Sequence, residues 1–553
     1  MKINLIKQLR EEPEIIEVDR GTPVREIADR YQGELAYRVL AARVDNMIVD
    51  LNEMLEREAT VELLDMRDTA TNLIYQHSLS LIYLKAINDV LGKVRVEIKN
   101  SLNKGLYTTI YPVSAVTEEQ IVRIESRMKE LVAQDIPLVK EVVTREQALE
   151  IFTNDGHNEK TRLLMGAEEQ RHYVFYSLNG YKNFFYGLMV PSTGYVEYFE
   201  LRKYGNGVLL RFPHPSRPDM IPAYVDEVKM YGAFREASIW GRLMGVSSVA
   251  DLNEKVDNGE YKELIQLSEA LHEKKIAEIA DTIKERKRRL ILIAGPSSSG
   301  KTTFAKRLCV QLKVNGLNPL YMGTDDYFVE RADTPLDEQG EPDYENLGAM
   351  EIDLFNSNMC DLLAGETVDL PTFDFLTGHK VYGKRITKIS ADQPIVIEGI
   401  HALNEAMTPG FSRDEKFKIY ISPLTQITID DHNRIPTTDA RMLRRLVRDN
   451  LYRGHDASST IASWYKVRRG EDKNIFPYNG EADVFFNSVH LYELAVLKKY
   501  AEPLLESVKP TQCEYAEATR LLKFLQFFLP IEDDSIIVNN SILREFIGGS
   551  IFV

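Results

Sequence analysis

The stretch LILIAGPSSSGKTT, residues 290–303, decides the fold of the second half of the chain. Its apolar start at 290–294 predicts a buried strand, and TTFAKRLCVQLK predicts the helix that follows. Between them, GPSSSGKT at 295–302 fits the pattern G-x-x-x-x-G-K-S/T. Gly295 and Gly300 permit backbone angles that aim N–H groups at an anion, and the helix N-terminus adds its dipole. The stretch therefore predicts a phosphate-binding loop.

The individual loop positions predict a nucleotide and a metal ion. Lys301 is expected to reach the β- and γ-phosphates, and the Thr302 hydroxyl can ligate Mg²⁺. We expect bound ATP to contact the whole loop, which comprises Gly295, Pro296, Ser297, Ser298, Ser299, Gly300, Lys301, Thr302 and Thr303.

Bulk composition limits the class of protein. A length of 553 residues predicts two to four domains, and a net charge of −16 argues against a broad electrostatic grip on nucleic acid. Cys309, Cys360 and Cys513 are too far apart for a metal-ligand spacing or a disulfide framework. No signal peptide and no run of 18 apolar residues is recognisable. We expect a soluble, cytoplasmic protein.

Acidic residues follow two of the apolar runs after the loop. Strand patterns in LYMGTDDYF, IVIEGI and FKIYISP alternate with helical ones, which predicts a parallel sheet flanked by helices. Asp325 and Asp326 come directly after the first run, at the sheet edge where ligands collect, and can accept a proton from an attacking hydroxyl. An acidic turn or helix cap is the alternative. Glu398 ends the second run and is placed to hold Mg²⁺ directly or through water.

Five arginines crowd into thirteen residues further on, at Arg441, Arg444, Arg445, Arg448 and Arg453. Like charges at helical spacing repel one another, so a surface helix seldom carries so many. A mobile lid that brings cations over a transferring phosphate explains the cluster. Pairing of the arginines with carboxylates elsewhere is the alternative.

The order and spacing of five motifs carry a family resemblance. These are GPSSSGKTT, TDDYF, LPTFDFLTGH, VIEGIHAL and RRLVRDNLYRGHD. With them, residues from about 290 to 490 resemble the uridine kinase family of P-loop nucleoside kinases. The resemblance implies ATP- and Mg²⁺-dependent transfer of the γ-phosphate to the 5′-hydroxyl of uridine or a related ribonucleoside. It makes Asp325 the base, with Asp326 its neighbour, and assigns catalytic roles to Lys301, Arg448 and Arg453.

The same resemblance implies contacts to the acceptor. Glu345, with Asp343 as competitor, matches the acidic residue that binds the ribose hydroxyls. Phe373 and Phe375 flank the segment that cradles the base, and one tyrosine of the family pattern is replaced by phenylalanine. His379 lies about one residue from the base-reading histidine, and His455 stands where an arginine is common. The implied substrate-binding residues are Asp325, Tyr327, Glu345, Phe373, Phe375 and His379.

The first half of the chain carries two other resemblances. Residues 1–60 resemble the TGS module, a β-grasp domain, and residues 61–210 resemble the α+β editing domain of threonyl-tRNA synthetases. Editing in that family needs an H-x-x-x-H pair and a C-x-x-x-H pair, of which His77 alone remains. The other three positions carry Leu81, Phe185 and Met189. We therefore predict no deacylase activity; binding of RNA, a regulator or a partner chain, or bracing of the kinase, stays open.

The expected layout has five parts, with two rival functions. The parts are 1–60, 61–210, a connector with helices at 211–288, the kinase at 289–490 and a C-terminal helical segment at 491–553. One rival is a phosphoribulokinase-like sugar-phosphate kinase, for which Lys380, Lys384 and Arg385 are the available cations. The other is an RNA-associated regulatory protein that uses the loop as a nucleotide switch. A homo-oligomer is compatible with either.

Overall fold

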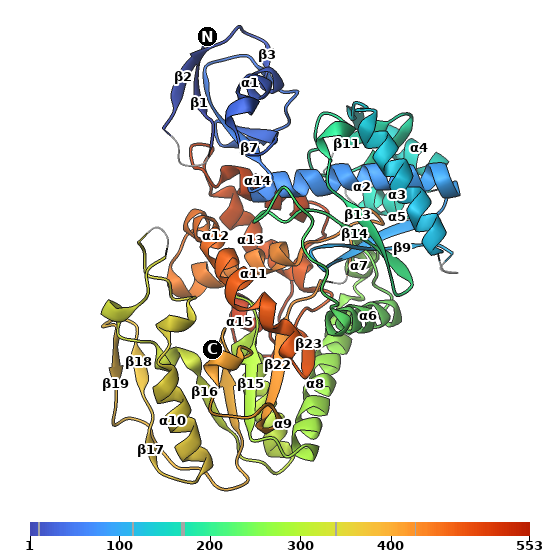
Figure 1. Cartoon of the computed structure of the whole chain (residues 1–553). Coiled ribbons are helices and arrows are strands. Elements are labelled where there is room, and N and C mark those ends of the chain that lie inside the picture. Colours follow the sequence, from blue (N-terminus) through green and yellow to red (C-terminus); the bar gives the residue numbers. More distant parts are fainter. Residues whose placement is uncertain (9–11, 113–115, 157, 167–171, 338–339, 426) are drawn as a thin grey trace.

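The computed structural model describes residues 1–8, 12–112, 116–156, 158–166, 172–337, 340–425 and 427–553. Figure 1 shows a small N-terminal module at one end, a parallel-sheet domain at the other, and the C-terminal helices between them. None of the helices in these ranges combines the length and the apolar character that crossing a membrane requires.

The N-terminal module is a five-stranded mixed sheet with one helix across it. The strand order is β2-β1-β7-β4-β5, with β1 parallel to β7. Alternation along β1 buries Ile3 and Leu5, and helix α1 buries Val24, Ile27 and Ala28 against the sheet. The predicted β-grasp architecture is confirmed. Its elements are β1 (Lys2–Ile6), β2 (Glu14–Glu17), β3 (Thr22–Pro23), α1 (Val24–Tyr31), β4 (Val39–Val44), β5 (Met47–Val49), β6 (Met54–Leu55) and β7 (Ala59–Asp65).

A second domain of helices and two antiparallel sheets follows, as the α+β prediction required. The sheets have the orders β13-β14-β9-β8 and β10-β11-β12. One apolar core runs from Ile3 in the first module to Phe212 at the end of this domain. Its elements are α2 (Thr69–Leu91), β8 (Val96–Leu102), β9 (Gly105–Ile110), α3 (Glu118–Ala133), β10 (Val139–Thr144), α4 (Arg145–Asp155), α5 (Asn158–Gly166), β11 (His172–Leu178), β12 (Tyr181–Phe184), β13 (Glu200–Tyr204) and β14 (Gly207–Arg211).

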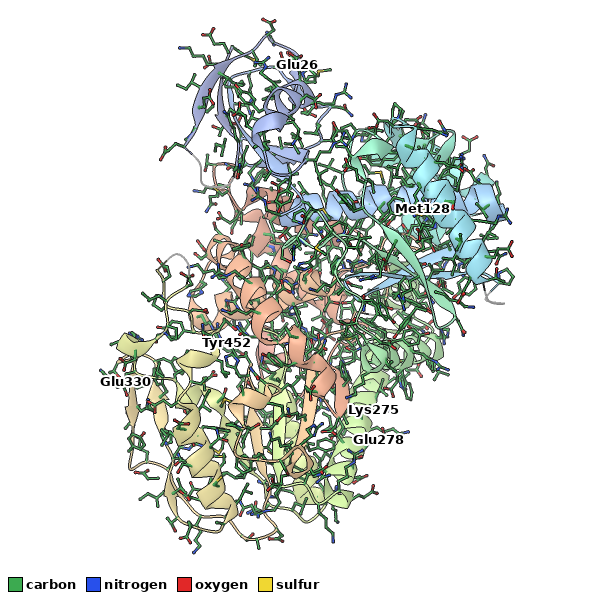
Figure 2. All side chains as sticks on the ribbon, viewed as in Figure 1. Glu26, Met128, Lys275, Glu278, Glu330 and Tyr452 are labelled. Carbon is green, nitrogen blue, oxygen red and sulfur yellow. The ribbon has the colours of Figure 1, made fainter. Side chains whose placement is uncertain are left out.

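Three helices connect this domain to the parallel sheet. They are α6 (Val228–Leu243), α7 (Val249–Asp257) and α8 (Tyr261–Glu285). Helix α8 buries Ile276 and Ile283 in the core shared with the parallel sheet. Its outer face carries Lys275 and Glu278, whose charged groups lie 3.0 Å apart (Figure 2).

The second half contains a five-stranded, fully parallel sheet, which confirms the predicted α/β fold. Its strand order is β16-β21-β15-β22-β23, and β15 is buried along its whole length. Because the strands are parallel, their carboxyl ends meet at one edge of the sheet. The elements are β15 (Leu290–Ala294), α9 (Lys301–Val314), β16 (Leu320–Gly323), α10 (Ile352–Leu363), β21 (Ile395–Glu398), β22 (Lys416–Ser422), α11 (Thr437–Arg453), α12 (Ala457–Asn474) and β23 (Val484–Asn487).

Two short antiparallel pairs belong to this domain, and Figure 1 shows β17, β18 and β19 near α10. They are β17 (Val368–Asp369) with β20 (Ile386–Thr387), and β18 (Thr372–Asp374) with β19 (His379–Val381). They carry the segment that is expected to receive the acceptor.

The C-terminal part packs on both halves of the molecule. It contains α13 (Glu493–Glu506), α14 (Tyr515–Leu525) and the short α15 (Arg544–Ile547), with irregular backbone between α14 and α15. Asn46 Nδ2 in the first module donates to the Pro510 carbonyl at 3.0 Å. The core that contains Phe524 and Phe546 also contains β15 residues of the parallel sheet.

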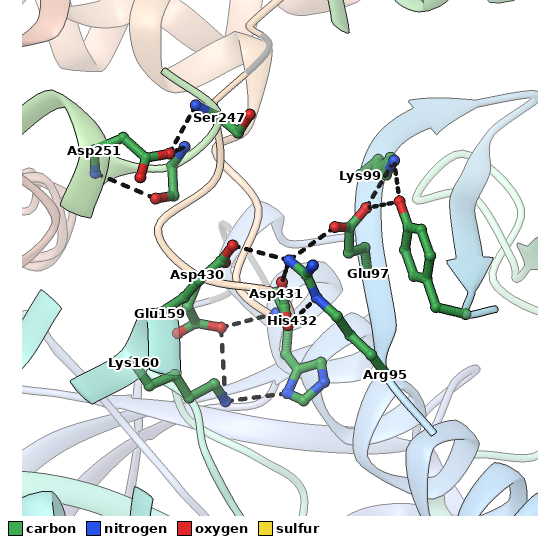
Figure 3. Close-up of polar contacts among 12 residues, drawn as sticks. Arg95, Glu97, Lys99, Glu159, Lys160, Ser247, Asp251, Asp430, Asp431 and His432 are labelled. Carbon is green, nitrogen blue, oxygen red and sulfur yellow. Dashed lines mark hydrogen bonds and ion pairs between the residues drawn. The ribbon is translucent and has the colours of Figure 1, made fainter. Parts of the chain in front are cut away.

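A polar cluster ties the second domain to the loop that precedes α11 (Figure 3). Arg95 donates to Asp431 at 2.8 Å and to Glu159 at 2.8 Å. The buried Lys160 ammonium lies 3.6 Å from the buried Asp430 carboxylate. Because a charge buried without a partner is costly, these pairs hold the loop in one place against the second domain. The N-terminus of α11, the helix that carries the arginine cluster, is therefore held in place by the second domain.

Candidate active site

The loop between β15 and α9 has the backbone of an anion-binding turn. A Cβ at Gly295 would lie 2.0 Å from the Ile421 carbonyl oxygen, so no other residue fits there. Ser298 and Gly300 both have positive φ angles, of 59° and 84°. The first hydrogen bond of α9 runs from the Phe304 N–H to the Gly300 carbonyl, which leaves the earlier N–H groups of the helix for other partners.

Side chains of this loop also fit a phosphate ligand. The Ser298 and Ser299 hydroxyls are buried and find no hydrogen-bond partner in the described part of the chain. Lys301 Nζ folds over the loop and donates to the carbonyls of Gly295 at 2.9 Å and Pro296 at 3.2 Å. Buried donors without partners are costly, and phosphate oxygens would supply acceptors for them.

A hydroxyl and a carboxylate meet beside the loop. Thr302 Oγ1 donates to Glu398 Oε1 at 2.7 Å, and the Tyr321 hydroxyl donates to the same oxygen at 2.7 Å. Burial and the neighbouring Glu398 raise the pKa of Tyr321, so it stays a neutral donor. Oxygen ligands of this kind suit Mg²⁺, and the residues present fit the predicted ion.

The two adjacent aspartates after β16 have different surroundings. Asp326 Oδ2 lies 2.5 Å from Arg385 Nη1, and its other oxygen accepts from the Phe373 N–H at 3.4 Å. The Asp325 carboxylate makes no hydrogen bond to any described residue, and its charged neighbours include Lys301 and Glu398. Asp326 is therefore held by the protein, whereas the Asp325 carboxylate has no such partner among the described residues.

The environment of Asp325 raises its proton affinity. Its side chain is exposed at the edge of the sheet. Desolvation by the neighbouring residues, followed by the nearby Glu398 carboxylate, raises the pKa of Asp325 to about 6. A carboxylate with such a pKa is a stronger base than an ordinary aspartate and is still ionised at neutral pH.

Glu345 lies in the same charged centre. Desolvation and then the Glu471 carboxylate raise its pKa to about 7. Its side chain packs against α12, where a Cβ at Gly470 would lie 2.7 Å from Glu345 Cγ. Of the two predicted ribose contacts, Asp343 instead accepts the Glu345 N–H at 3.2 Å and so holds the turn that carries Glu345.

The predicted base-binding residues separate into buried and exposed groups. Phe373 is buried, while Phe375 is 59% exposed, and their ring centroids lie 5.1 Å apart at a steep angle. The His379 side chain is 71% exposed and pairs with Glu330, which Figure 2 shows at the outer edge of the domain.

Tyr327, a predicted substrate contact, lies in the core of the domain. Its side chain is fully buried in the core with Phe355, and its hydroxyl accepts from Asn358 Nδ2 at 3.2 Å. The short 3-10 turn after β16 directs this ring into the core, away from the edge where Asp325 lies.

The arginine cluster of α11 is not a lid throughout. Arg441 and Arg444 are buried and pair with Glu471 and Glu493, the latter at 2.6 Å. Arg441 Nε also donates to the Ser297 carbonyl at 2.9 Å. For these two arginines the lid prediction is wrong: they lock α11 onto the phosphate loop.

The other three arginines surround one carboxylate. Asp449 is buried and lies 3.2 Å from Arg445, 2.8 Å from Arg448 and 3.4 Å from Arg453. Arg445 also reaches the loop, where it donates to the Ser297 hydroxyl at 3.0 Å. Arg453 is half exposed and is a charge neighbour of Asp325. Catalytic roles of Arg448 and Arg453 stay predictions.

Four residues at the site were not predicted from the sequence. Glu471 accepts the Ser297 N–H at 2.9 Å, and Glu545 accepts the Thr303 N–H at 3.2 Å. Tyr321 and Asp449 organise Glu398 and the arginines. Tyr321 lies in the predicted strand and Asp449 in the arginine motif, so the local sequence could have pointed to both. Glu471 and Glu545 lie far along the chain from the phosphate loop, and no local pattern pointed to them.

Three positions of the second domain that were matched to editing residues of threonyl-tRNA synthetases carry packed apolar side chains. Leu81, Phe185 and Met189 all belong to the N-terminal core. His77 contacts Phe185 and Tyr186, and burial lowers its pKa to about 4, so the ring is neutral. The absence of deacylase activity stays a prediction, and this packing is consistent with it.

Comparisons with known proteins agree with this description. Residues 290–495 match the Phosphoribulokinase / Uridine kinase family, and residues 11–65 match the TGS domain. The N-terminal region is similar to threonine–tRNA ligases. That of Fusobacterium nucleatum is 32% identical over 32% of this chain and 29% of its own length. That of Halorhodospira halophila is 27% identical over 38% of this chain and 34% of its own length. The chain thus spans about a third of these relatives.

Two solved structures resemble part of the chain. A possible uridine kinase from Bacillus stearothermophilus shares 22% identity, with a TM-score of 0.27, over 38% of this chain and 97% of its own. A D-glycerate 3-kinase from Cryptococcus neoformans shares 14% identity, with a TM-score of 0.22, over 45% of this chain and 87% of its own. Residues 290–495, with their parallel sheet and phosphate loop, match the Phosphoribulokinase / Uridine kinase family; a match to the TGS domain and a region similar to threonine–tRNA ligases precede them.

Proposed function

We propose that the chain is an ATP- and Mg²⁺-dependent nucleoside kinase that phosphorylates the 5′-hydroxyl of uridine or a related ribonucleoside. The observation that carries the proposal is the contrast between the two aspartates after β16. Asp326 is bound to Arg385, whereas Asp325 is free to accept a proton and lies among the charges of the phosphate loop. A hydroxyl acceptor needs such a base beside the phosphate site.

The residues of the site divide the work of phosphoryl transfer. Mg²⁺-ATP, when bound, would supply the γ-phosphoryl group and a positive metal charge that offsets the negative phosphate oxygens, and ADP would be the leaving group. Asp325 takes the proton from the acceptor hydroxyl. Lys301 and the arginines Arg448 and Arg453 stabilise the negative charge that develops on the equatorial oxygens. Thr302 and Glu398 would hold the metal ion, with Tyr321 fixing the carboxylate.

A flat aromatic acceptor fits the segment around β18 and β19. Phe373 and Phe375 meet edge to face, and Phe328 joins both rings at centroid distances of 5.8 and 6.3 Å. The exposed face of Phe375 offers a stacking surface for a base. We propose Glu345 as the contact to the ribose hydroxyls, because it is an acceptor close to Lys301.

A phosphorylated sugar is a weaker candidate because two nearby cations are already paired. Lys380 Nζ is buried and lies 2.5 Å from Glu351 and 3.0 Å from the Phe328 carbonyl. Arg385 is held by Asp326. A phosphate on the acceptor would have to compete with these carboxylates.

An acceptor panel tests the proposal. Purified protein, Mg²⁺ and ATP are incubated with the four ribonucleosides, their deoxy forms and ribulose 5-phosphate, and the products are separated by chromatography. The proposal expects one ribonucleoside, uridine or a close relative, to be phosphorylated at its 5′-hydroxyl well above the rest. Phosphorylation of ribulose 5-phosphate alone, or of no compound while ATP still binds, would refute it.

For the N-terminal half we propose a binding or bracing role without editing. Its partners would be RNA, a small regulator or a partner chain. Retention on RNA that weakens steeply with salt, without any nucleoside phosphorylation, would instead favour a regulatory protein that uses the phosphate loop as a switch.

A further inference from the structure

The C-terminal segment 541–553 lies directly on the phosphate loop. The Ile542 side chain is fully buried, and its Cγ2 lies 2.4 Å from the position that a Cβ on Gly300 would occupy. Lys306 Nζ on α9 donates to the Phe552 carbonyl. The segment also contacts α11, where a Cβ on Gly548 would lie 3.2 Å from Leu451 Cδ2. It therefore bridges the two helices that carry phosphate-site residues, although it lies outside the matched kinase residues.

Glu545 of this segment binds the first turn of α9. Its Oε2 accepts the Thr303 N–H at 3.2 Å and the Thr303 hydroxyl at 2.7 Å. N–H groups of a first helical turn have no acceptor within the helix, and in a phosphate loop they bind the nucleotide phosphates. A carboxylate on such a group makes the same charge-assisted contact as a phosphate oxygen.

Glu545 differs from the other carboxylate that binds the loop. Glu471 accepts the Ser297 N–H, and its charge is balanced by Arg441 and by Arg468 at 3.2 Å. Glu545 is almost completely buried, at 7% exposure, and no described lysine, arginine or histidine lies within ion-pair distance of it. Among the described residues, its side-chain hydrogen bonds go to Thr303 alone. A buried negative charge without a cation is stabilised only by the donors at the helix start.

We propose that Glu545 is a tethered competitor of the nucleotide: it occupies a phosphate-binding donor of α9, and nucleotide binding and release of segment 541–553 are linked. Two negative groups cannot share this turn without repulsion, so each weakens the other by the same factor. The inference rests on the proposed function in that the competing ligand is Mg²⁺-ATP. It adds a regulatory role for a segment that the kinase family match does not include.

The first test is a binding titration with the β,γ-imido analogue of ATP and Mg²⁺, on the full chain. Glu545→Gln keeps an acceptor for Thr303 but removes the charge. We expect it to lower the Kd of the analogue by about fivefold or more, in the usual range of coupling between two ligands. The matched control is Glu532→Gln, which removes one charge from an exposed residue of the same C-terminal part and should leave the Kd unchanged.

The second test uses the unaltered protein, so its result does not depend on whether a substituted protein folds. Amide hydrogen exchange is followed in peptides that cover 541–553, with and without the same analogue. Release of the segment predicts faster exchange when the nucleotide is bound. Unchanged or slower exchange would contradict linked release.

The outcomes separate this inference from the proposed function. Equal Kd values for the unaltered protein and Glu545→Gln, with nucleoside phosphorylation intact, overturn the inference alone. Weaker binding by Glu545→Gln overturns it as well, because the carboxylate would then support the nucleotide site. Failure of both proteins to bind the analogue overturns the inference and the proposed function together.

Discussion

Thr302 Oγ1 and Glu398 Oε1 lie 2.7 Å apart, which joins the first turn of α9 to the carboxyl end of β21. The two residues are almost a hundred positions apart in the chain, and the pairing of β15 with β21 brings them together. The Tyr321 hydroxyl donates to the same carboxylate oxygen from β16. Three neighbouring elements thus set the geometry of the proposed Mg²⁺ ligands.

Replacement of Tyr321 by phenylalanine should weaken the use of Mg²⁺ without removing a ligand. The variant loses the hydroxyl that fixes Glu398, so we expect the Mg²⁺ concentration for half-maximal activity to rise by about tenfold or more. The measurement is a Mg²⁺ titration of the initial rate at saturating ATP. Tyr465→Phe, at an exposed site on α12, is the matched control. An unchanged Mg²⁺ requirement in Tyr321→Phe would argue against Glu398 as a metal ligand.

The pH dependence of activity should reflect the raised pKa of Asp325. Its pKa of about 6 lies above that of an ordinary aspartate, so the carboxylate is lost as the pH falls through 6 and the base is present above it. We expect kcat/KM for the acceptor to fall about tenfold per pH unit below this value and to level off above it, because kcat/KM reports the free enzyme. Protein stability is checked at each pH by circular dichroism.

Glu345 gives this pH experiment an internal comparison. Its pKa of about 7 would add a second loss of activity at higher pH if its ionised form binds the acceptor. Glu345→Gln should remove that second step and leave the one near 6. A profile that stays flat down to pH 5 would show that neither carboxylate acts as proposed.

The buried pair of Arg444 and Glu493 should contribute to stability rather than to catalysis alone. Both side chains are fully buried and 2.6 Å apart, so Glu493→Gln leaves a buried guanidinium without its counter-charge. We expect the free energy of unfolding to fall by about 3–5 kcal/mol. Urea denaturation measures this loss.

An exposed pair and a double variant serve as controls for that experiment. Arg20 and Glu56 are largely exposed, so Glu56→Gln should cost less than about 1 kcal/mol. Arg444→Met combined with Glu493→Leu should cost less than the sum of the single changes, because no charge is left unpaired. A single Glu493→Gln change that matches the exposed control would refute the structural role.

Local patterns in the sequence were sufficient for the sheet, the loop and the acidic residues that follow the strands. The apolar runs that precede Gly295 and Asp325 can be recognised as strands from a few residues. Parallel pairing then places Gly295 and Asp325 at the same edge of the sheet. The partners of Arg441 and Arg444 could not be predicted in this way, because Glu471 and Glu493 come from other elements and no spacing rule connects them. The direction in which a side chain points from an irregular turn could not be predicted from the sequence either.

Tyr327 illustrates that last limit. It follows Asp325 by two residues, and in a regular strand both side chains would point to the same face. The chain instead enters a 3-10 turn at Thr324, which buries Tyr327 and leaves Asp325 open. The contact between Glu545 and Thr303 was even harder to predict from the sequence, because over two hundred residues separate the two positions.

A comparison of the turnover of the Asp325→Asn and Asp326→Asn variants tests the central claim most directly. Both changes remove one charge from adjacent positions, and ATP binding is measured in parallel. The account predicts that Asp325→Asn lowers kcat by about 10²–10⁴-fold with ATP affinity nearly unchanged. Asp326→Asn should retain far more turnover and mainly raise the KM of the acceptor, because Arg385 loses its partner. An almost fully active Asp325→Asn variant, or the reverse order of the two, would contradict the assignment of Asp325 as the base.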